Sequence, residues 1–241
     1  MMYHSTKRGK MQNFINSVLR FIKYPIALLL LGAFYPMSMA LFHMIIQTFR
    51  MDILLYFLMP IVGVMILWGV IPGLNGSALT IFAHEATHML AAVLTFHKPK
   101  GMSIRQGEGG SFSYTGKGNW LITIAPYFFP TFPFLWMLGG LWFSYHNQVF
   151  PIWYIMTFGF LVGYHIVSNF YQIHSEQTDF KKAGYLFSIM FIPGANILLI
   201  GYLWSFVLNG WSGLSHWQQM AFLECSKFTR EVFQLIIRYI S

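Results

Sequence analysis

Charged residues are scarce in this chain. Only 9% of its 241 residues are Asp, Glu, Lys or Arg, whereas 56% are hydrophobic. A typical soluble domain has about 25% charged residues. A chain with so few cannot cover a globule with a polar surface, so the composition argues against a soluble protein and indicates an integral membrane protein.

Cysteine is nearly absent, and acidic residues are few. The single cysteine, Cys225, excludes an internal disulfide and any metal site built from several cysteines. The seven acidic residues are Asp52, Glu85, Glu108, Glu176, Asp179, Glu224 and Glu231. The formal net charge of +8 comes from Lys and Arg that lie mostly in the tails and short loops, where they anchor membrane spans. No basic stripe interleaved with stacking aromatics occurs, so we expect no nucleic-acid partner.

What the chain does have is a series of apolar runs, each about as long as a bilayer crossing requires. We predict an all-α integral membrane protein with about six transmembrane helices in a domain that covers residues 25–208. The predicted spans are residues 25–49, 53–71, 77–96, 120–145, 150–173 and 183–208.

The two ends differ from these spans because they mix charge with an apolar stripe. Residues 1–24 are basic and carry apolar residues at three- and four-residue spacing, which predicts an amphipathic helix on the membrane surface. A cleaved signal peptide is the alternative, since Ser38 and Ala40 form a small-x-small pattern. Residues 209–241 are predicted to form an interfacial C-terminal helix.

One long polar connection separates the third and fourth spans. The runs "MSIRQ" and "SFSYT" flank "GEGG", and the second run alternates aromatic and hydroxyl side chains. Two short runs around a glycine-rich turn predict a short β-hairpin, with an irregular loop as the alternative. Two spans separate this segment from the 174–182 connection, so both are expected on the same side of the membrane.

The chemistry of the chain is concentrated in the third span, "TIFAHEATHMLAAVL". Residues four apart share a helix face, so His84 and His88 can offer nitrogens to one metal ion, and Glu85 can act as a general base. A charged side chain in mid-span costs about 3 kcal/mol to insert, which argues for a function. Packing of the three side chains as interhelical hydrogen-bond partners is the alternative.

A zinc site needs a third protein ligand. The other acids lie in a turn, at the hairpin tip or in the tail, except for Glu176 and Asp179. Asp179 is favoured because it stands where the chain enters the sixth span, with His174, Glu176 and His165 as alternatives. His165, Asn169 and His174 could instead hydrogen-bond a metal ligand or stabilise an oxyanion, or act as polar contacts between helices.

An HExxH motif in an apolar helix, followed by a hairpin and by an Asp at a later span, resembles the site-2 protease family of intramembrane zinc metalloproteases. The resemblance covers residues 77–208. It implies that His84, His88 and Asp179 bind one zinc ion per chain and that Glu85 activates water. It also implies that the hairpin presents the substrate as an added strand.

The chain departs from the usual family pattern at two points. Its Asp179 stands in Gln-Thr-Asp-Phe rather than in an Asn-Pro…Leu-Asp-Gly setting, and the length leaves no room for a PDZ-like module. The resemblance therefore implies a minimal, divergent member.

The expected function is that of an intramembrane zinc metalloprotease, a multi-pass protein of the bacterial inner membrane that cleaves a transmembrane protein substrate in the lipid bilayer. Two alternatives stay open. One is a membrane zinc hydrolase of a non-peptide substrate such as a lipid amide. The other is a non-enzymatic membrane protein that binds a partner.

Overall fold

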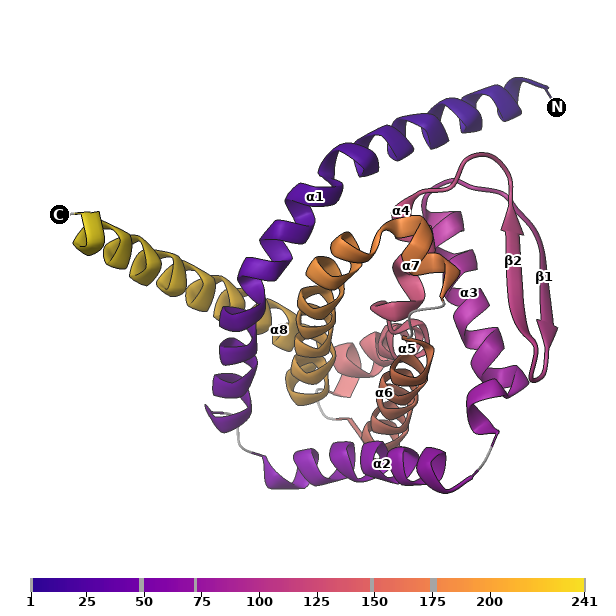
Figure 1. The fold of residues 1–241 in the computed structure, drawn as a ribbon. Helices are drawn as coiled ribbons and strands as arrows, with labels where there is room; N and C mark the ends of the chain where they lie inside the picture. The colour runs from indigo at the N-terminus through magenta and orange to yellow at the C-terminus, as the bar shows by residue number, and fades with distance from the viewer. Residues whose placement is uncertain (1, 48–49, 72, 148–149, 174–176, 241) are drawn as a thin grey trace.

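The computed structural model describes the whole chain except residues 1, 48–49, 72, 148–149, 174–176 and 241 (Figure 1). Its elements follow in the order α1 Met2–Gln47, α2 Met51–Val70, η1 Leu74–Gly76, α3 Ala78–Leu94, β1 Pro99–Arg105, β2 Gly109–Tyr114, α4 Trp120–Ile124, η2 Ala125–Tyr127, α5 Thr131–Asn147, α6 Ile152–Gln172, α7 Thr178–Ala183 and α8 Tyr185–Ile240. The predicted helical class and the hairpin are confirmed.

The prediction of about six spans is not confirmed. Among the described residues, α1, α2 and α8 are long and apolar enough to cross a membrane, and a bent pair, α4–η2 with α5, could count as a fourth span. The motif helix α3 has 17 residues, which at about 1.5 Å each give about 26 Å, less than the apolar thickness of a bilayer. Helix α6 has 21 residues, but polar side chains near its C-terminal end lower its hydropathy.

The predicted span 120–145 is the clearest correction. Its two helical parts meet at an angle of 83° rather than forming one rod. Proline explains the break, because Pro126 lies in η2 and Pro130 directly precedes α5. The bend turns the chain into the interior of the protein, where Ile122, Ile124 and Tyr127 are almost completely buried.

Each of the two long terminal helices includes a boundary between predicted segments. Helix α1 continues without a break through residues 24 and 25. In α8 the backbone leaves helical geometry at Asn209 and Gly210, which is where the C-terminal segment was predicted to begin. The helix then packs on the core as far as Trp217 and Ala221, and its C-terminal end projects from the body (Figure 1). The location of both end segments on a membrane surface stays a prediction.

The hairpin pairs β1 with β2 in antiparallel register, with Met102 opposite Phe112 and Ile104 opposite Gly110. Gly107 and Gly109 at the turn have φ of 77° and 104°, a region that glycine adopts without strain. The hairpin lies beside α3 (Figure 1). It therefore places the backbone of β2 next to the motif helix.

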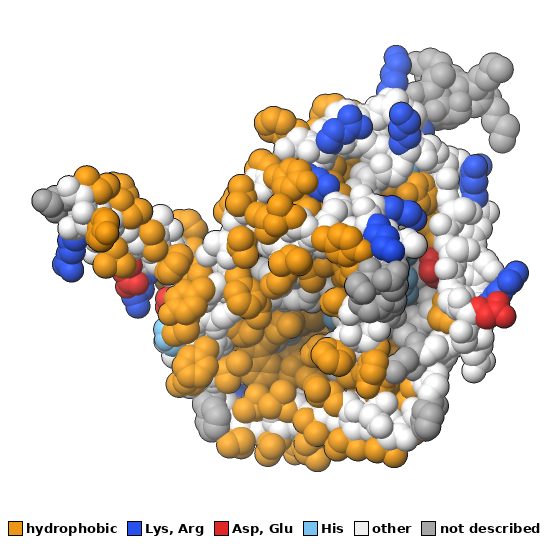
Figure 2. Space-filling view, in the orientation of Figure 1, with side chains coloured by type: hydrophobic (Ala, Val, Ile, Leu, Met, Phe, Trp, Pro, Cys, Tyr) orange, Lys and Arg blue, Asp and Glu red, His pale blue; other side chains and the backbone are white. Residues whose placement is uncertain are grey.

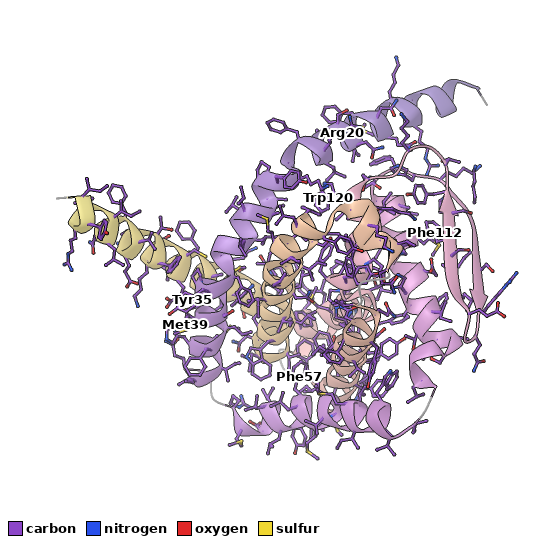
Figure 3. The ribbon with its side chains drawn as sticks, in the orientation of Figure 1. Arg20, Tyr35, Met39, Phe57, Phe112 and Trp120 are labelled. Carbon is purple, nitrogen blue, oxygen red and sulfur yellow. The ribbon has the colours of Figure 1, made fainter. Side chains whose placement is uncertain are left out.

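Close helix packing holds α6 against α2. Gly159 and Gly163 lie one turn apart on α6, and a Cβ at either position would meet the backbone of Phe57 or Ile61 on α2. Small residues at this spacing let two membrane helices approach closely. Figure 3 shows Phe57 at this helix contact. The contact fixes where the polar C-terminal end of α6 meets the motif helix.

On the face shown in Figure 2, apolar side chains cover much of the helical body, whereas Lys and Arg gather around the N-terminal half of α1 and near α7. Large apolar side chains such as Phe21, Leu29, Val70 and Ile189 are between 68% and 82% exposed. Such extensive exposed apolar surface fits contact with lipid.

Candidate metal centre

The motif helix α3 begins at a well-formed cap. The Ser77 side chain accepts a hydrogen bond from the Thr80 amide, and the Thr80 hydroxyl donates to the Leu74 carbonyl at 2.9 Å. From this start, His84, Glu85 and His88 follow on the side of the helix that faces the hairpin, α4 and α7. Glu85 and His88 are buried, 7% and 9% exposed.

The short helix α7 supplies the carboxylate. Asp179 is in its first turn, where a helix N-terminus favours a negative charge. The next residue, Phe180, is buried and packs its ring 4.5 Å from that of Tyr127. This packing holds α7 against the bend between α4 and α5. It therefore fixes the position of the backbone that carries Asp179.

The side chains of His84, His88 and Asp179 converge on one point. The two Nε2 atoms are 3.1 Å apart, and Oδ2 of Asp179 lies 3.6 Å from Nε2 of His84 and 3.3 Å from Nε2 of His88. Zinc bonds of about 2.0–2.1 Å in tetrahedral geometry place ligand atoms about 3.3 Å apart. The observed triangle therefore has the size and the donor types that a zinc ion requires, and the three residues could hold one.

Hydrogen bonds on the far side of each imidazole orient it toward this point. Nδ1 of His88 donates to the Ile122 carbonyl at 2.7 Å, and Nδ1 of His84 donates to the carboxamide oxygen of Gln172. The Gln172 amide nitrogen in turn donates to the Ser168 hydroxyl at 3.0 Å. Because both Nδ1 atoms carry the proton, each Nε2 presents a lone pair to the centre, as ligation requires.

The Asp179 carboxylate receives a further hydrogen bond from the Tyr127 hydroxyl, 3.1 Å from Oδ2. Burial alone would favour the neutral acid, but when no metal is bound and the imidazole Nε2 atoms carry protons, hydrogen bonds and charge interactions with His84 and His88 outweigh burial and hold the pKa of Asp179 well below its usual range. Asp179 is therefore ionised near neutral pH, in the form that binds a cation.

A cavity of about 250 Å³ opens beside the triangle, lined by residues of α3, β2, α4 and α7. Glu85 lines this cavity, and its carboxylate makes no hydrogen bond or ion pair to the side chains that the structure describes. The β2 residues Gly110, Ser111 and Phe112 form part of the wall. The sequence predicts that the hairpin and the 174–182 connection lie on the same side of the membrane. The shared cavity of β2 and α7 agrees with this prediction.

Comparison with protein-family models gave one match, Peptidase M50B-like, over residues 53–176. The match spans half of the chain and includes the HEATH motif of α3. The chain belongs to this peptidase family. The predicted membership of the site-2 protease family is thereby confirmed. Comparisons with curated proteins and with solved structures gave no match.

The M50B-like family is a family of zinc-dependent membrane metallopeptidases, which supports a protease and a membrane location for this chain. The matched region ends before Asp179. The position of Asp179 in the triangle therefore rests on the geometry of the structure and not on the family match.

The M50B-like centre does not include all the residues singled out from the sequence. His165 and Asn169 bond to each other at 3.1 Å and line a separate cavity of about 20 Å³ on the other side of His84. The cavity that holds Glu85 and Asp179 does not include them. His174 and Glu176 lie outside the described residues.

Two residues of this centre were not predicted from the sequence. Gln172 orients His84, and Tyr127 donates to Asp179. A signal for Gln172 does exist, because Ser168 and Gln172 continue the polar face of α6 that also carries His165 and Asn169. Tyr127 sits in the aromatic run "APYFFP" and has no comparable signal.

Proposed function

We propose that this chain is an intramembrane zinc metallopeptidase that hydrolyses a peptide bond of a membrane-embedded protein substrate. The observation that carries the proposal is the cavity itself. The triangle of His84, His88 and Asp179 lies on one side of the cavity, next to the buried Glu85. Strand β2 forms the other side.

His84, His88 and Asp179 would hold one zinc ion per chain. When bound there, zinc acts as a Lewis acid that makes water a stronger nucleophile and polarises a carbonyl. Three protein ligands leave one position of a tetrahedral site for this chemistry. Gln172 and the Ile122 carbonyl keep the imidazoles in the ligating tautomer.

Glu85 is the proposed general base. It stands next to His84 in the chain, and its carboxylate borders the cavity without a hydrogen-bonding partner among the described residues. It would accept a proton from the attacking water and return it to the leaving amine. This step needs a carboxylate that is free to exchange a proton, and a salt bridge to Glu85 would remove that freedom.

The hairpin favours a peptide over a lipid amide. Within the described residues the sheet has two strands, so one edge of β2 has unpaired backbone groups, and β2 borders the cavity. An extended peptide can add to such an edge through main-chain hydrogen bonds. A transmembrane substrate would have to unwind locally to pair there, which would expose its scissile bond beside Glu85.

The test compares Glu85→Gln with Glu108→Gln in the full-length protein, with zinc measured on the purified variants and cleavage measured in cells. Glu108 is an exposed acid at the hairpin tip, so its substitution removes the same charge away from the cavity. We expect one zinc per chain in both variants. We also expect that cleavage of co-expressed, doubly tagged single-span proteins falls at least about 100-fold in Glu85→Gln alone. Equal cleavage by the two variants would contradict the role of Glu85.

Metal analysis separates the peptidase from a non-enzymatic membrane protein. His84→Ala is expected to lose stoichiometric zinc, and a chelator is expected to abolish cleavage by the wild-type chain. Full-length protein that purifies without zinc would favour a partner-binding role. An oxyanion-stabilising role for His165 or Asn169, and a location in a bacterial inner membrane, stay predictions.

A further inference from the structure

A second cavity lies next to the metal centre and is lined by cations. Its volume is about 590 Å³, within the range of pockets that take small ligands. Its walls come from three parts of the chain: the face of α1 at residues 13–23, the segment 114–123, and Lys182 of α7. Figure 3 shows Arg20 on α1 near Trp120 of α4, at this groove.

Four cationic side chains line the groove, namely Arg20, Lys23, Lys117 and Lys182, and no acidic residue does. None of the four forms an ion pair with an acid in the part of the chain that the structure describes. Lys182 interacts electrostatically with Glu85 across the neighbouring cavity, but Arg20, Lys23 and Lys117 meet no acidic residue in the lining of the groove, and an anion between these cations would offset their mutual repulsion. The grouping therefore points to an anionic ligand.

Polar contacts between the walls hold the groove in shape. The Asn16 amide donates to the Lys117 carbonyl at 2.8 Å, the Asn119 amide donates to Asn16 at 2.8 Å, and the Trp120 indole donates to the Leu19 carbonyl at 2.7 Å. Lys23 is held with its Nζ 4.9 Å from the centre of the Phe187 ring. The cations thus project from fixed backbone rather than from a loose tail.

The position of the groove indicates where the anion comes from. On α1, the face next to the groove carries Phe14, Phe21 and Leu28, which are 59–82% exposed. An exposed apolar face beside a cationic face is typical of helices at the level of lipid headgroups, which agrees with the predicted position of this segment on the membrane surface. Arg and Lys are the usual partners of phosphate oxygens, with Arg able to bind two at once.

We propose that this groove binds the phosphate of an anionic phospholipid headgroup. The headgroup would join α1 to α7, the helix that also presents Asp179 three residues before Lys182. Tyr114, Thr123 and Lys182 line both cavities, so the lipid would sit beside the substrate cavity. Any effect of the lipid on cleavage rests on the proposed peptidase function, whereas the binding itself does not.

The experiment uses full-length protein in nanodiscs of phosphatidylcholine with or without phosphatidylglycerol, and lipid retention is measured by native mass spectrometry. Arg20→Gln/Lys117→Gln is compared with Lys7→Gln/Lys227→Gln, which removes the same charge from exposed positions elsewhere. Circular dichroism of all variants confirms that they fold. Inorganic phosphate is titrated against the wild-type protein in phosphatidylcholine discs.

We expect wild-type protein to retain phosphatidylglycerol and to bind inorganic phosphate weakly. The groove variant should lose about 25-fold in apparent affinity, at about fivefold for each cation, while the control variant keeps its affinity. Slower amide exchange at residues 114–123 and 178–183 should accompany the lipid. Equal losses in both variants, absence of that protection, or tight binding of inorganic phosphate without an effect of phosphatidylglycerol would overturn the proposal. Each readout is independent of peptidase activity.

Discussion

At the scale of single residues, Gly110 governs how closely the hairpin approaches the motif helix. A Cβ at this position would lie 2.5 Å from Cγ2 of Ile81 and 2.8 Å from Cγ of Glu85. Both distances are far below van der Waals contact, so Gly110→Ala must displace β2 or the side chains of Ile81 and Glu85 that face it. We expect a loss of about 1–3 kcal/mol in unfolding free energy and a fall in cleavage of about 10- to 100-fold, with zinc retained.

The matched control for Gly110 is Gly101→Ala in the partner strand. A Cβ there meets only Ser113 Oγ at 3.9 Å, which is an ordinary contact. Thermal unfolding, zinc content and cleavage of a tagged single-span protein measure the difference. If Gly101→Ala and Gly110→Ala behave alike, the spacing between hairpin and helix does not limit activity.

Gln172 is a positioning residue that acts through His84. Its carboxamide oxygen accepts the Nδ1 proton, so Gln172→Ala leaves His84 free to rotate or to change tautomer. We expect zinc affinity to fall about 10- to 100-fold, measured by competition with a fluorescent chelator. Gln219→Ala, at an exposed position on α8, is the control and should bind zinc as the wild type does. If Gln172→Ala binds zinc with unchanged affinity, Gln172 does not position His84 for ligation.

At the scale of elements, the α2–α6 contact positions the polar end of α6. A Cβ at Gly163 would lie 2.8 Å from the Ile61 Cα, which is backbone and cannot move aside without separating the helices. Gly163→Ala should therefore lower the unfolding free energy by about 1–3 kcal/mol, seen as a lower Tm by circular dichroism in detergent. Gly139→Ala on α5 meets nothing within 4 Å and should not lower the Tm. A similar Tm for both variants would show that this contact is loose.

Elements with a strong local signal could be predicted from the sequence. The apolar run around HEATH predicts α3, and the alternation in "SFSYT" beside glycine predicts the hairpin, because side-chain periodicity and turn chemistry are local properties. The span 120–145 could not be predicted as a bent pair, although Pro126 and Pro130 are visible in it. Proline is tolerated within membrane helices, so the angle depends on packing that a hydropathy window does not describe.

Within the candidate site, His84, Glu85 and His88 could be predicted from a local signal, whereas Asp179 and Tyr127 could not. Their spacing on one helix is a local pattern. Asp179 was favoured by elimination, which a chain with seven acids allows and a charge-rich chain would not. Tyr127 joins the centre only because the bend before α5 brings it to α7, and a contact of that kind depends on the assembled fold.

At the scale of the whole molecule, the N-terminal half of α1 fastens the base of the hairpin. Arg8, Gln12 and Asn16 are spaced four residues apart on one face of α1. They donate to the backbone carbonyls of residues 96 and 97 before the hairpin, and of residues 115 and 117 after it. These bonds join parts of the chain that are about 100 residues apart, and no local pattern in the sequence indicates them.

This contact predicts that Gln12→Ala/Asn16→Ala loosens β1 and β2 without emptying the metal centre. The two lost hydrogen bonds are each worth about 1 kcal/mol, so hairpin opening becomes about tenfold to 30-fold more frequent. Amide exchange in residues 99–114 should quicken by that factor and cleavage should fall, with zinc content unchanged. Asn13→Ala/Ser17→Ala is the matched control, because within the described residues the Ser17 hydroxyl donates inside α1, to the Asn13 carbonyl. If exchange in the hairpin quickens equally in both variants, the N-terminal helix does not hold the substrate strand, and the hairpin is stabilised by its contact with α3 alone.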